Sequence, residues 1–167
     1  MGKRSTKENK NIYQTSRETA GLSRESAEEV LGFVSADRIE RIESGRSMPH
    51  PDEVLAMEQG YKNHELSNYY CTNECPIGKK YVPRAKLKPL PQLTVELLAA
   101  LHDMEDEERN IIDIARDGRV NAFERERFDA ILEKLVSLDR TISDMRIWIE
   151  HALSSGKMDE ADRLSSP

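Results

Sequence analysis

The chain has 167 residues, of which 34% are charged, 37% are hydrophobic and only 5% are aromatic. This composition argues against one large core and favours several small, mostly helical cores. No run approaches the ~18 consecutive apolar residues that a membrane span requires. The charged N-terminus also lacks the apolar stretch of a signal peptide, so we expect a cytoplasmic protein.

Charge is distributed unevenly along the chain. Residues 1–90 carry 15 Lys and Arg against 13 Asp and Glu, a net charge of +2, whereas residues 91–167 carry 10 against 18, a net charge of −8. Within the first part, residues 1–10 (+3) and 79–88 (+5) flank an acidic stretch at 11–65 (−5). This asymmetry predicts two halves with different roles.

Residues 1–10 are polar and basic and show no hydrophobic periodicity. Such a segment cannot bury enough apolar surface to fold, so we expect a disordered tail. Its alternative role is that of a basic arm that contacts DNA phosphates.

Short helical segments alternate with turn signals over residues 11–70, the predicted first domain. Apolar residues recur at spacings of three and four, and Gly21, Gly32 and Gly45 are typical helix stop signals. The predicted helices span 12–20, 24–31, about 36–44 with Ser35 as its cap, 51–59 and 64–70. Each helix is too short to be stable alone, so their apolar faces must bury one another.

Residues 71–92 contain four prolines, which exclude a continuous helix and predict an extended linker. The linker also carries the most basic stretch of the chain. We interpret these side chains either as solvated or as phosphate contacts beside the first domain: Lys79, Lys80, Arg84, Lys86 and Lys88.

Two cysteines in this linker, Cys71 and Cys75, are separated by three residues, close to the spacing of metal ligands. A zinc site needs four ligands, and neither His50 nor His64 has a suitable spacing. Our preferred interpretation is therefore two reduced thiols in a packed turn. A disulfide, or a zinc site shared by two chains, stays open, and no cofactor is predicted.

From residue 93 the pattern changes to long helices. Apolar spacing predicts one helix over 93–116, and Asn121 with Glu124 forms a capping box for a second helix over 121–154. The second helix carries a coiled-coil-like seam with alternating spacings of three and four: Phe128, Ile131, Leu135, Leu138, Ile142, Met145, Ile149 and Ala152. We expect an antiparallel hairpin over 93–155, whose seam is either a homodimer interface or the core of a monomer, and fraying over 156–167.

The segment 21–49 contains two short helices joined by a tight turn, with the outer side of the second helix exposed. Its marker residues are Gly21-Leu22-Ser23, Leu31-Gly32, Ile39, Ile42-Glu43, Gly45 and Pro49. With these residues the segment resembles the lambda-repressor-like helix-turn-helix family, the XRE-type regulators. This resemblance implies an all-α, five-helix domain that binds double-stranded DNA as a dimer on a palindromic operator.

Carried onto this chain, the resemblance implies a set of DNA-contacting residues around the second helix of the pair. They are Ser23, Arg24, Ser35, Ala36, Asp37, Arg38, Arg41 and Arg46. Arg24 takes a place near the phosphate backbone, Asp37 is a candidate acceptor for a cytosine amino group, and Arg38 is a candidate reader of guanine. The chain departs from the family in one extra residue between Gly32 and Ile39 and in Glu28, which stands where the family usually has a small buried Ala. Asp37 and Glu40 on the predicted recognition helix are a further departure, because carboxylates repel phosphates.

No nucleophile elbow, P-loop, dinucleotide-binding or zinc-protease motif occurs in the chain, so no catalytic activity is predicted. The acidic run at 105–108 points in several directions on a helix and is best interpreted as a solvated face. We interpret the chain as a sequence-specific, repressor-like transcriptional regulator of bacterial or mobile-element type. The alternative is a protein-interaction adaptor or antirepressor that uses the helix-turn-helix as a frame.

Overall fold

The computed structural model of the protein describes residues 10–116 and 118–158, and over these residues the chain forms nine helices and no strand. This confirms the predicted all-α fold. The chain divides into two compact units: unit 1 contains residues up to Val82 and those from His151, and unit 2 is Pro83–Glu150. Most of the predicted basic and frayed tails lies outside the described residues. No helix in the described part is long and apolar enough to span a membrane.

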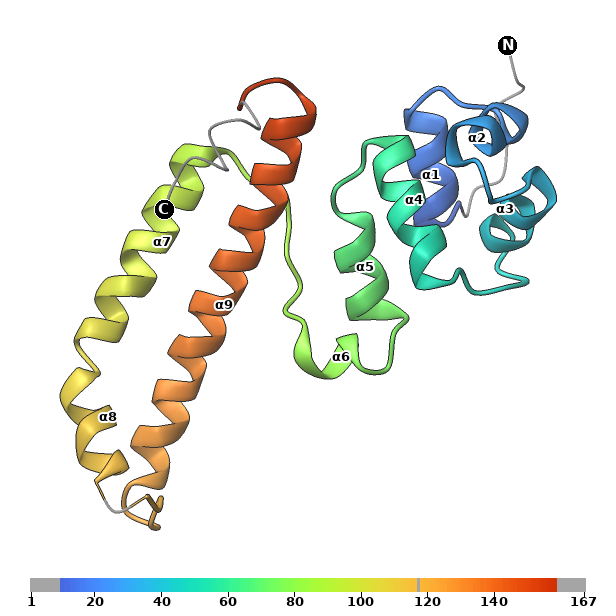
Figure 1. Cartoon of the computed structure of the whole chain (residues 1–167). Helices are drawn as coiled ribbons and strands as arrows, with labels where there is room; N and C mark the ends of the chain where they lie inside the picture. Colours follow the sequence, from blue (N-terminus) through green and yellow to red (C-terminus); the bar gives the residue numbers. More distant parts are fainter. Residues whose placement is uncertain (1–9, 117, 159–167) are drawn as a thin grey trace. The chain divides into compact units, whose positions relative to one another are not determined.

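Unit 1 begins with a cluster of short helices (Figure 1). They are α1 (Ile12–Thr19), α2 (Arg24–Leu31), α3 (Ala36–Glu43), α4 (Pro51–Tyr61), α5 (Leu66–Asn73) and α6 (Gly78–Tyr81). The first five match the predicted helices to within three residues at each end. Helix α6 is a correction, because the linker was expected to be wholly extended.

The first three helices begin where polar side chains cap them. The Ser23 side chain accepts a hydrogen bond from a backbone N–H at the start of α2. The Ser35 side chain likewise accepts a hydrogen bond from Arg38 N, at 3.2 Å, at the start of α3. Gly32 ends α2 with a φ of 76°, in the left-handed region that glycine enters without steric cost. These local signals fix the lengths of α2 and α3 and therefore the turn between them.

One apolar core holds α1 to α5 together. Its side chains come from every one of these helices and from the turn after α2: Tyr13, Ala27, Leu31, Val34, Ile39, Ile42, Val54, Met57, Tyr61 and Leu66. Gly60 allows α4 to approach α2, because a Cβ there would lie 2.9 Å from a Leu31 side-chain atom. The core therefore fixes how α3 is oriented within unit 1.

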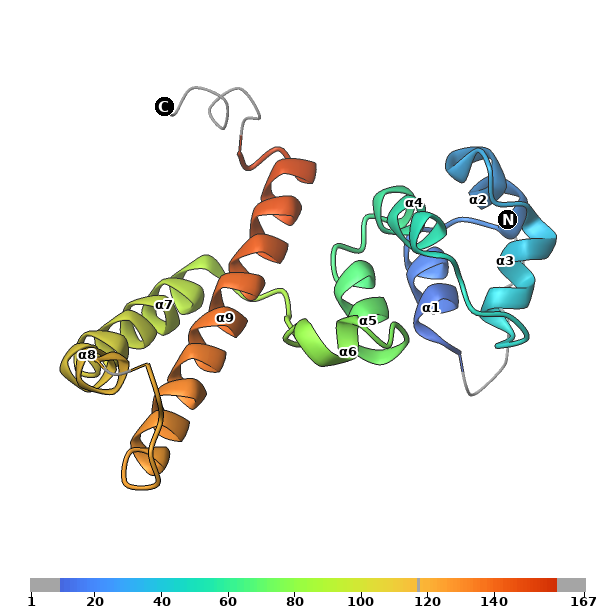
Figure 2. The same cartoon turned by 60° about the horizontal axis from the view of Figure 1, so that its bottom comes forward.

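Unit 2 is an antiparallel hairpin of α7 (Leu90–Glu105) and α8 (Glu108–Ala115) against α9 (Arg125–Ser154), as Figures 1 and 2 show, and the part of α9 from His151 belongs to unit 1. The predicted first helix is thus broken between Glu105 and Glu108. Four consecutive carboxylates repel one another at this point, and acidic side chains are unfavourable at the C-terminus of α7. Glu107 instead accepts a hydrogen bond from Lys134 Nζ at 2.5 Å, which links the break to α9.

Helix α9 begins four residues later than predicted, although the capping box is formed. Asn121 Oδ1 accepts from Glu124 N at 3.1 Å, and Glu124 Oε2 accepts from Asn121 N at 3.0 Å. The predicted seam is buried at Ile131 and Ala152. Between them the buried positions differ from the prediction and are Thr141, Asp144 and Ile147.

The cause of this difference is the segment that precedes α7. Asp144, only 1% exposed, accepts a hydrogen bond from Lys86 N at 2.7 Å and pairs with Lys88 Nζ at 2.7 Å. Lys88 also pairs with Glu96 at 2.7 Å, and these contacts raise the pKa of the Lys88 ammonium. The polar contact therefore replaces Ile142 in the buried face, and Ile142 is left 38% exposed.

Candidate nucleic-acid interface

The predicted interface is built on α3, which is anchored by its inner face. Ile39 and Ile42, three residues apart, are 0% and 1% exposed, so α3 is held tightly against the core. Its outer side carries no large apolar side chain and presents Asp37 and Arg41, which form an ion pair at 2.8 Å with both side chains more than half exposed. The predicted geometry, a short helix with an open outer side, is therefore present.

A buried carboxylate connects the three helices of this region. Glu43, at the end of α3, accepts hydrogen bonds from Arg17 Nε at 2.5 Å and from Arg24 Nε at 2.9 Å. Burial alone would lower the pKa of Arg17, but the hydrogen bonds and charge of Glu43 outweigh it and raise that pKa. Arg24 is thus partly engaged inside the unit, and its side chain remains 36% exposed.

Arg38 is placed differently from the expectation that it reads guanine. Its Nε and one terminal nitrogen donate to the two Glu53 oxygens, each at 2.7 Å, and further bonds go to Ser47 Oγ and Met48 O. The Glu53 hydrogen bond, against the opposing effect of burial, raises the pKa of Arg38. The guanidinium therefore fixes the loop between α3 and α4 and faces inward.

The remaining predicted residues occupy the ends of α3. Arg46, just beyond the helix, donates from Nε to Ser44 Oγ at 2.9 Å and pairs with Glu40, and its side chain is 63% exposed. At the other end, Ala36 N donates to Glu28 Oε2 at 3.0 Å. Glu28 is thus a residue of the site that the sequence identified only as a departure from the family, and its carboxylate lies where a helix N-terminus attracts an anion.

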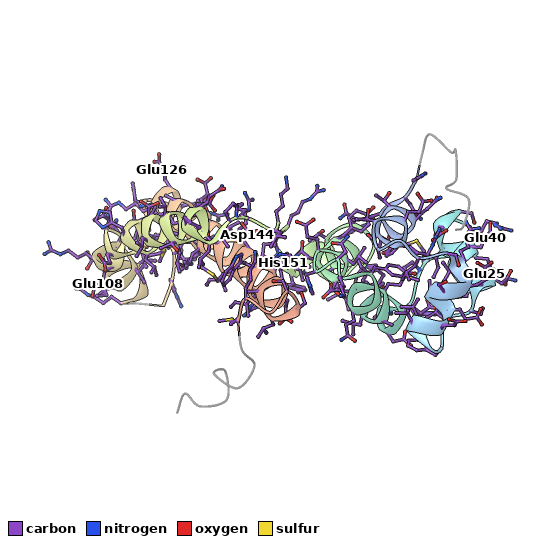
Figure 3. The ribbon with its side chains drawn as sticks, turned by 90° about the horizontal axis from the view of Figure 1, so that it is seen from above. Glu25, Glu40, Glu108, Glu126, Asp144 and His151 are labelled. Atoms are coloured by element: carbon purple, nitrogen blue, oxygen red, sulfur yellow. The ribbon has the colours of Figure 1, made fainter. Side chains whose placement is uncertain are left out.

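Acidic side chains dominate the exposed surface of α2 and α3. Glu25, Glu28 and Glu29 are exposed on α2, and Figure 3 shows Glu25 and Glu40 pointing outward from unit 1. Against them, only Arg41 and Arg46 present mostly exposed guanidinium groups, because Arg24 and Arg38 partner buried carboxylates.

The five basic side chains of the predicted linker fall into two groups. In unit 1, Lys79 and Lys80 are exposed on α6, and Lys80 Nζ lies 5.1 Å from the centre of the Tyr81 ring. In unit 2, Arg84 and Lys86 are exposed, whereas Lys88 is held by its two carboxylates. Lys88 is therefore not placed as a phosphate contact.

Cys71 and Cys75 are both free thiols and are half-buried. Cys75 Sγ accepts a weak hydrogen bond from Gly78 N at 3.4 Å, and burial raises the pKa of the Cys71 thiol. Within the described ranges, no group of three or more His, Cys, Asp or Glu side chains is placed to hold a metal ion.

Together, the capped α2, the tight turn and the outward-facing α3 define a helix-turn-helix domain. Residues 14–63 match the family model described as "Helix-turn-helix domain". The matched segment covers most of α1 and all of α2 to α4, the helices that position the outer side of α3. Neither the curated proteins nor the solved structures gave a significant match.

Proposed function

We propose that unit 1 is a sequence-specific DNA-binding module of the XRE type and that the protein is a repressor-like transcriptional regulator. The observation that carries this proposal is the outer side of α3, which is polar, exposed and held rigidly by Ile39 and Ile42. A short helix mounted this way enters the major groove with its first residues at base edges. Such a role places the protein in the cytoplasm, in a bacterial or mobile-element setting, and needs no catalytic group.

The proposed contacts divide by chemistry. At the start of α3, Ser35, Ala36 and Asp37 face base edges, and Asp37 is suited to accept a hydrogen bond from a cytosine amino group. Arg41 lies one turn further along the same side. Backbone phosphates are contacted from the rim, by Ser23, Arg24, Arg46, Lys79, Lys80, Arg84 and Lys86.

The acidic surface of α2 lowers general attraction to DNA. Glu25, Glu28 and Glu29 repel phosphates, so binding depends on base contacts and on the rim cations. A homodimer formed through the C-terminal helices doubles these contacts and matches two half-sites.

A second candidate function follows from the same acidic surface. Because exposed carboxylates outnumber the exposed guanidinium groups on α2 and α3, the face is also suited to a basic protein partner. In this adaptor function the helix-turn-helix serves as a frame.

Selection of bound duplexes from a random pool tests the proposal. The account predicts enrichment of a palindromic motif by the wild-type chain. Arg41→Ala removes a base-side contact, so we expect a relaxed preference at one position and about tenfold weaker binding. Lys62→Ala, an exposed Lys at the far end of α4, is the matched control and should leave the motif unchanged. Recovery of no motif favours the adaptor function.

A further inference from the structure

Each helix of the unit 2 hairpin leaves a second row of large apolar side chains in solvent. On α7 the row is Val95, Leu98 and Leu101, between 44% and 68% exposed. On α8 and α9 it continues with similarly exposed side chains: Ile111, Ile112, Leu132, Leu135, Val136 and Ile142. A monomeric soluble domain rarely exposes so many neighbouring apolar side chains.

The rows of α7 and α9 lie on the same broad face of the hairpin, which we call the apolar face. Successive helical residues advance by about 100°. Along α7, Leu98 is displaced from the buried Leu93 in the same rotational sense as Leu132 and Val136 are displaced from the buried Ile131 on α9. Because the two helices are antiparallel (Figure 1), the same rotational sense brings both rows to one side.

A cavity indents this face near the end of the hairpin. It has a volume of about 260 Å³, and its walls are almost entirely apolar. Its lining includes Ile111 and Leu135 of the apolar face together with the deeper Ile114, Phe128 and Ile131. The apolar face therefore has both a cavity and exposed apolar side chains. This combination suits packing against another helix, whose side chains can fill the cavity.

We propose that a second copy of this chain covers the apolar face, with the two α9 helices antiparallel, so that two hairpins complete a four-helix bundle. This rests on the homodimer in the proposed function and specifies its surface and orientation. A two-helix hairpin has too little interior for its apolar residues, and a second identical hairpin buries them symmetrically.

Charges along the same side of α9 determine the orientation. Arg125 and Asp129 lie near its start, and Arg146 and Glu150 lie near its end. Arg125 and Asp129 pair within α9 at 3.4 Å and remain more than half exposed, so their charges are available at the interface.

A two-fold axis between Ser137 and Leu138 sets Arg125 opposite Glu150 of the second copy and Asp129 opposite Arg146 of the second copy. The same register brings the second copy's Ile142 to within one residue of the level of Leu132. In a parallel arrangement each of these charged residues would instead face the same residue of the second copy, and the like charges would repel each other.

A charge-exchange cycle, read by analytical ultracentrifugation of the full chain without DNA, tests the orientation. Arg125→Glu places like charges together twice per dimer, so we expect about a tenfold rise in the dimer dissociation constant. Glu150→Arg should have a similar effect, and the double variant R125E/E150R should restore most of the affinity. Arg127→Glu is the matched control: Arg127 is exposed near the start of α9, about 180° around the helix from Val136, and its replacement should leave the constant unchanged.

Two results would overturn the inference. One is a wild-type chain that stays monomeric at the highest concentration it tolerates, which would leave the face to a different partner or to an apolar ligand. The other is a double variant that dissociates at least as readily as either single variant. Helicity measured by circular dichroism separates dissociation from unfolding. If the chain still selects a DNA motif but the charge-exchange cycle fails, only the proposed dimer is contradicted. If the cycle behaves as expected but no DNA motif is selected, only the proposed DNA binding is contradicted.

Discussion

Arg38 donates hydrogen bonds to Glu53, Ser47 and Met48, and these contacts join α3 to the loop that leads into α4. Arg38→Ala would leave the nearly buried Glu53 carboxylate without its cationic partner. We expect a loss of about 2 kcal/mol in the free energy of unfolding. Urea denaturation measures it, and Arg41→Ala, a mostly exposed Arg on the same helix, should change stability by less than about 0.5 kcal/mol. Equal losses in the two variants would contradict this division of roles.

Glu53 also gives unit 1 a defined response to acid. Burial raises its pKa, but the hydrogen bonds from Arg38 and His50 N outweigh burial, so the pKa lies below its ordinary value of 4.5. A carboxylate with a lowered pKa in the folded state stabilises the fold above its unfolded pKa, and this contribution disappears as the pH falls through the folded pKa. We expect the stability difference between the wild type and Glu53→Gln to shrink as the pH falls from 7 to about 3. A difference that stays constant over this range would be inconsistent with the ionised pair.

At the scale of single residues, the sequence identified positions better than roles. The caps Ser23 and Ser35 follow from local rules that depend on a few neighbouring residues. The inward orientation of the Arg38 side chain does not follow from such local rules. Its partner Glu53 lies 15 residues away in the sequence, and only the packed core brings the two side chains together. For the same reason the pairing of Arg17 and Arg24 on Glu43 required the structure.

Helices α5 and α6 meet at a glycine with no room for a side chain. A Cβ at Gly78 would lie 2.3 Å from Cys71 O, and backbone atoms cannot easily yield. Gly78→Ala should therefore destabilise unit 1 by about 1 to 3 kcal/mol. Thermal unfolding checks this, with Lys79→Ala on the same helix as the control. A Gly78→Ala protein as stable as the control would show that the close approach is absent.

Among the elements, α1 to α4 were the easiest to predict because each one carries a cap, a glycine stop signal or a proline at its start. Helices α5 and α6 have no side-chain cap, and α6 was not predicted. The hairpin was harder. Periodicity predicts that α7 and α8 are helical, but the break between them depends on repulsion in an acidic run and on the contact between Glu107 and Lys134. The buried face of α9 departs from the 3-4 pattern because the chain before α7 packs on Asp144, and periodicity cannot reveal such a contact.

At the scale of the whole molecule, the two units support two separate tasks. Unit 1 presents one outward-facing α3, which in the proposed function reads a single half-site, and unit 2 has an apolar face that pairs two chains in the proposed dimer. We expect Val136→Glu, at the centre of that face, to produce a folded monomer that binds the selected duplex at least tenfold more weakly. Light scattering and a mobility shift measure the two effects. A dimeric variant, or a monomer with undiminished affinity, would contradict the linkage between pairing and DNA binding.

The most direct test of the central claim is the salt dependence of binding to a selected duplex, measured by fluorescence anisotropy. If α3 enters the groove with Arg41 and Arg46 on the phosphates and bases, affinity falls steeply as salt rises, and R41E/R46E weakens binding and flattens the slope. Lys62→Glu should preserve both. Absence of salt-sensitive binding by the wild-type chain, or an unchanged slope in the double variant, would contradict the proposed role of α3.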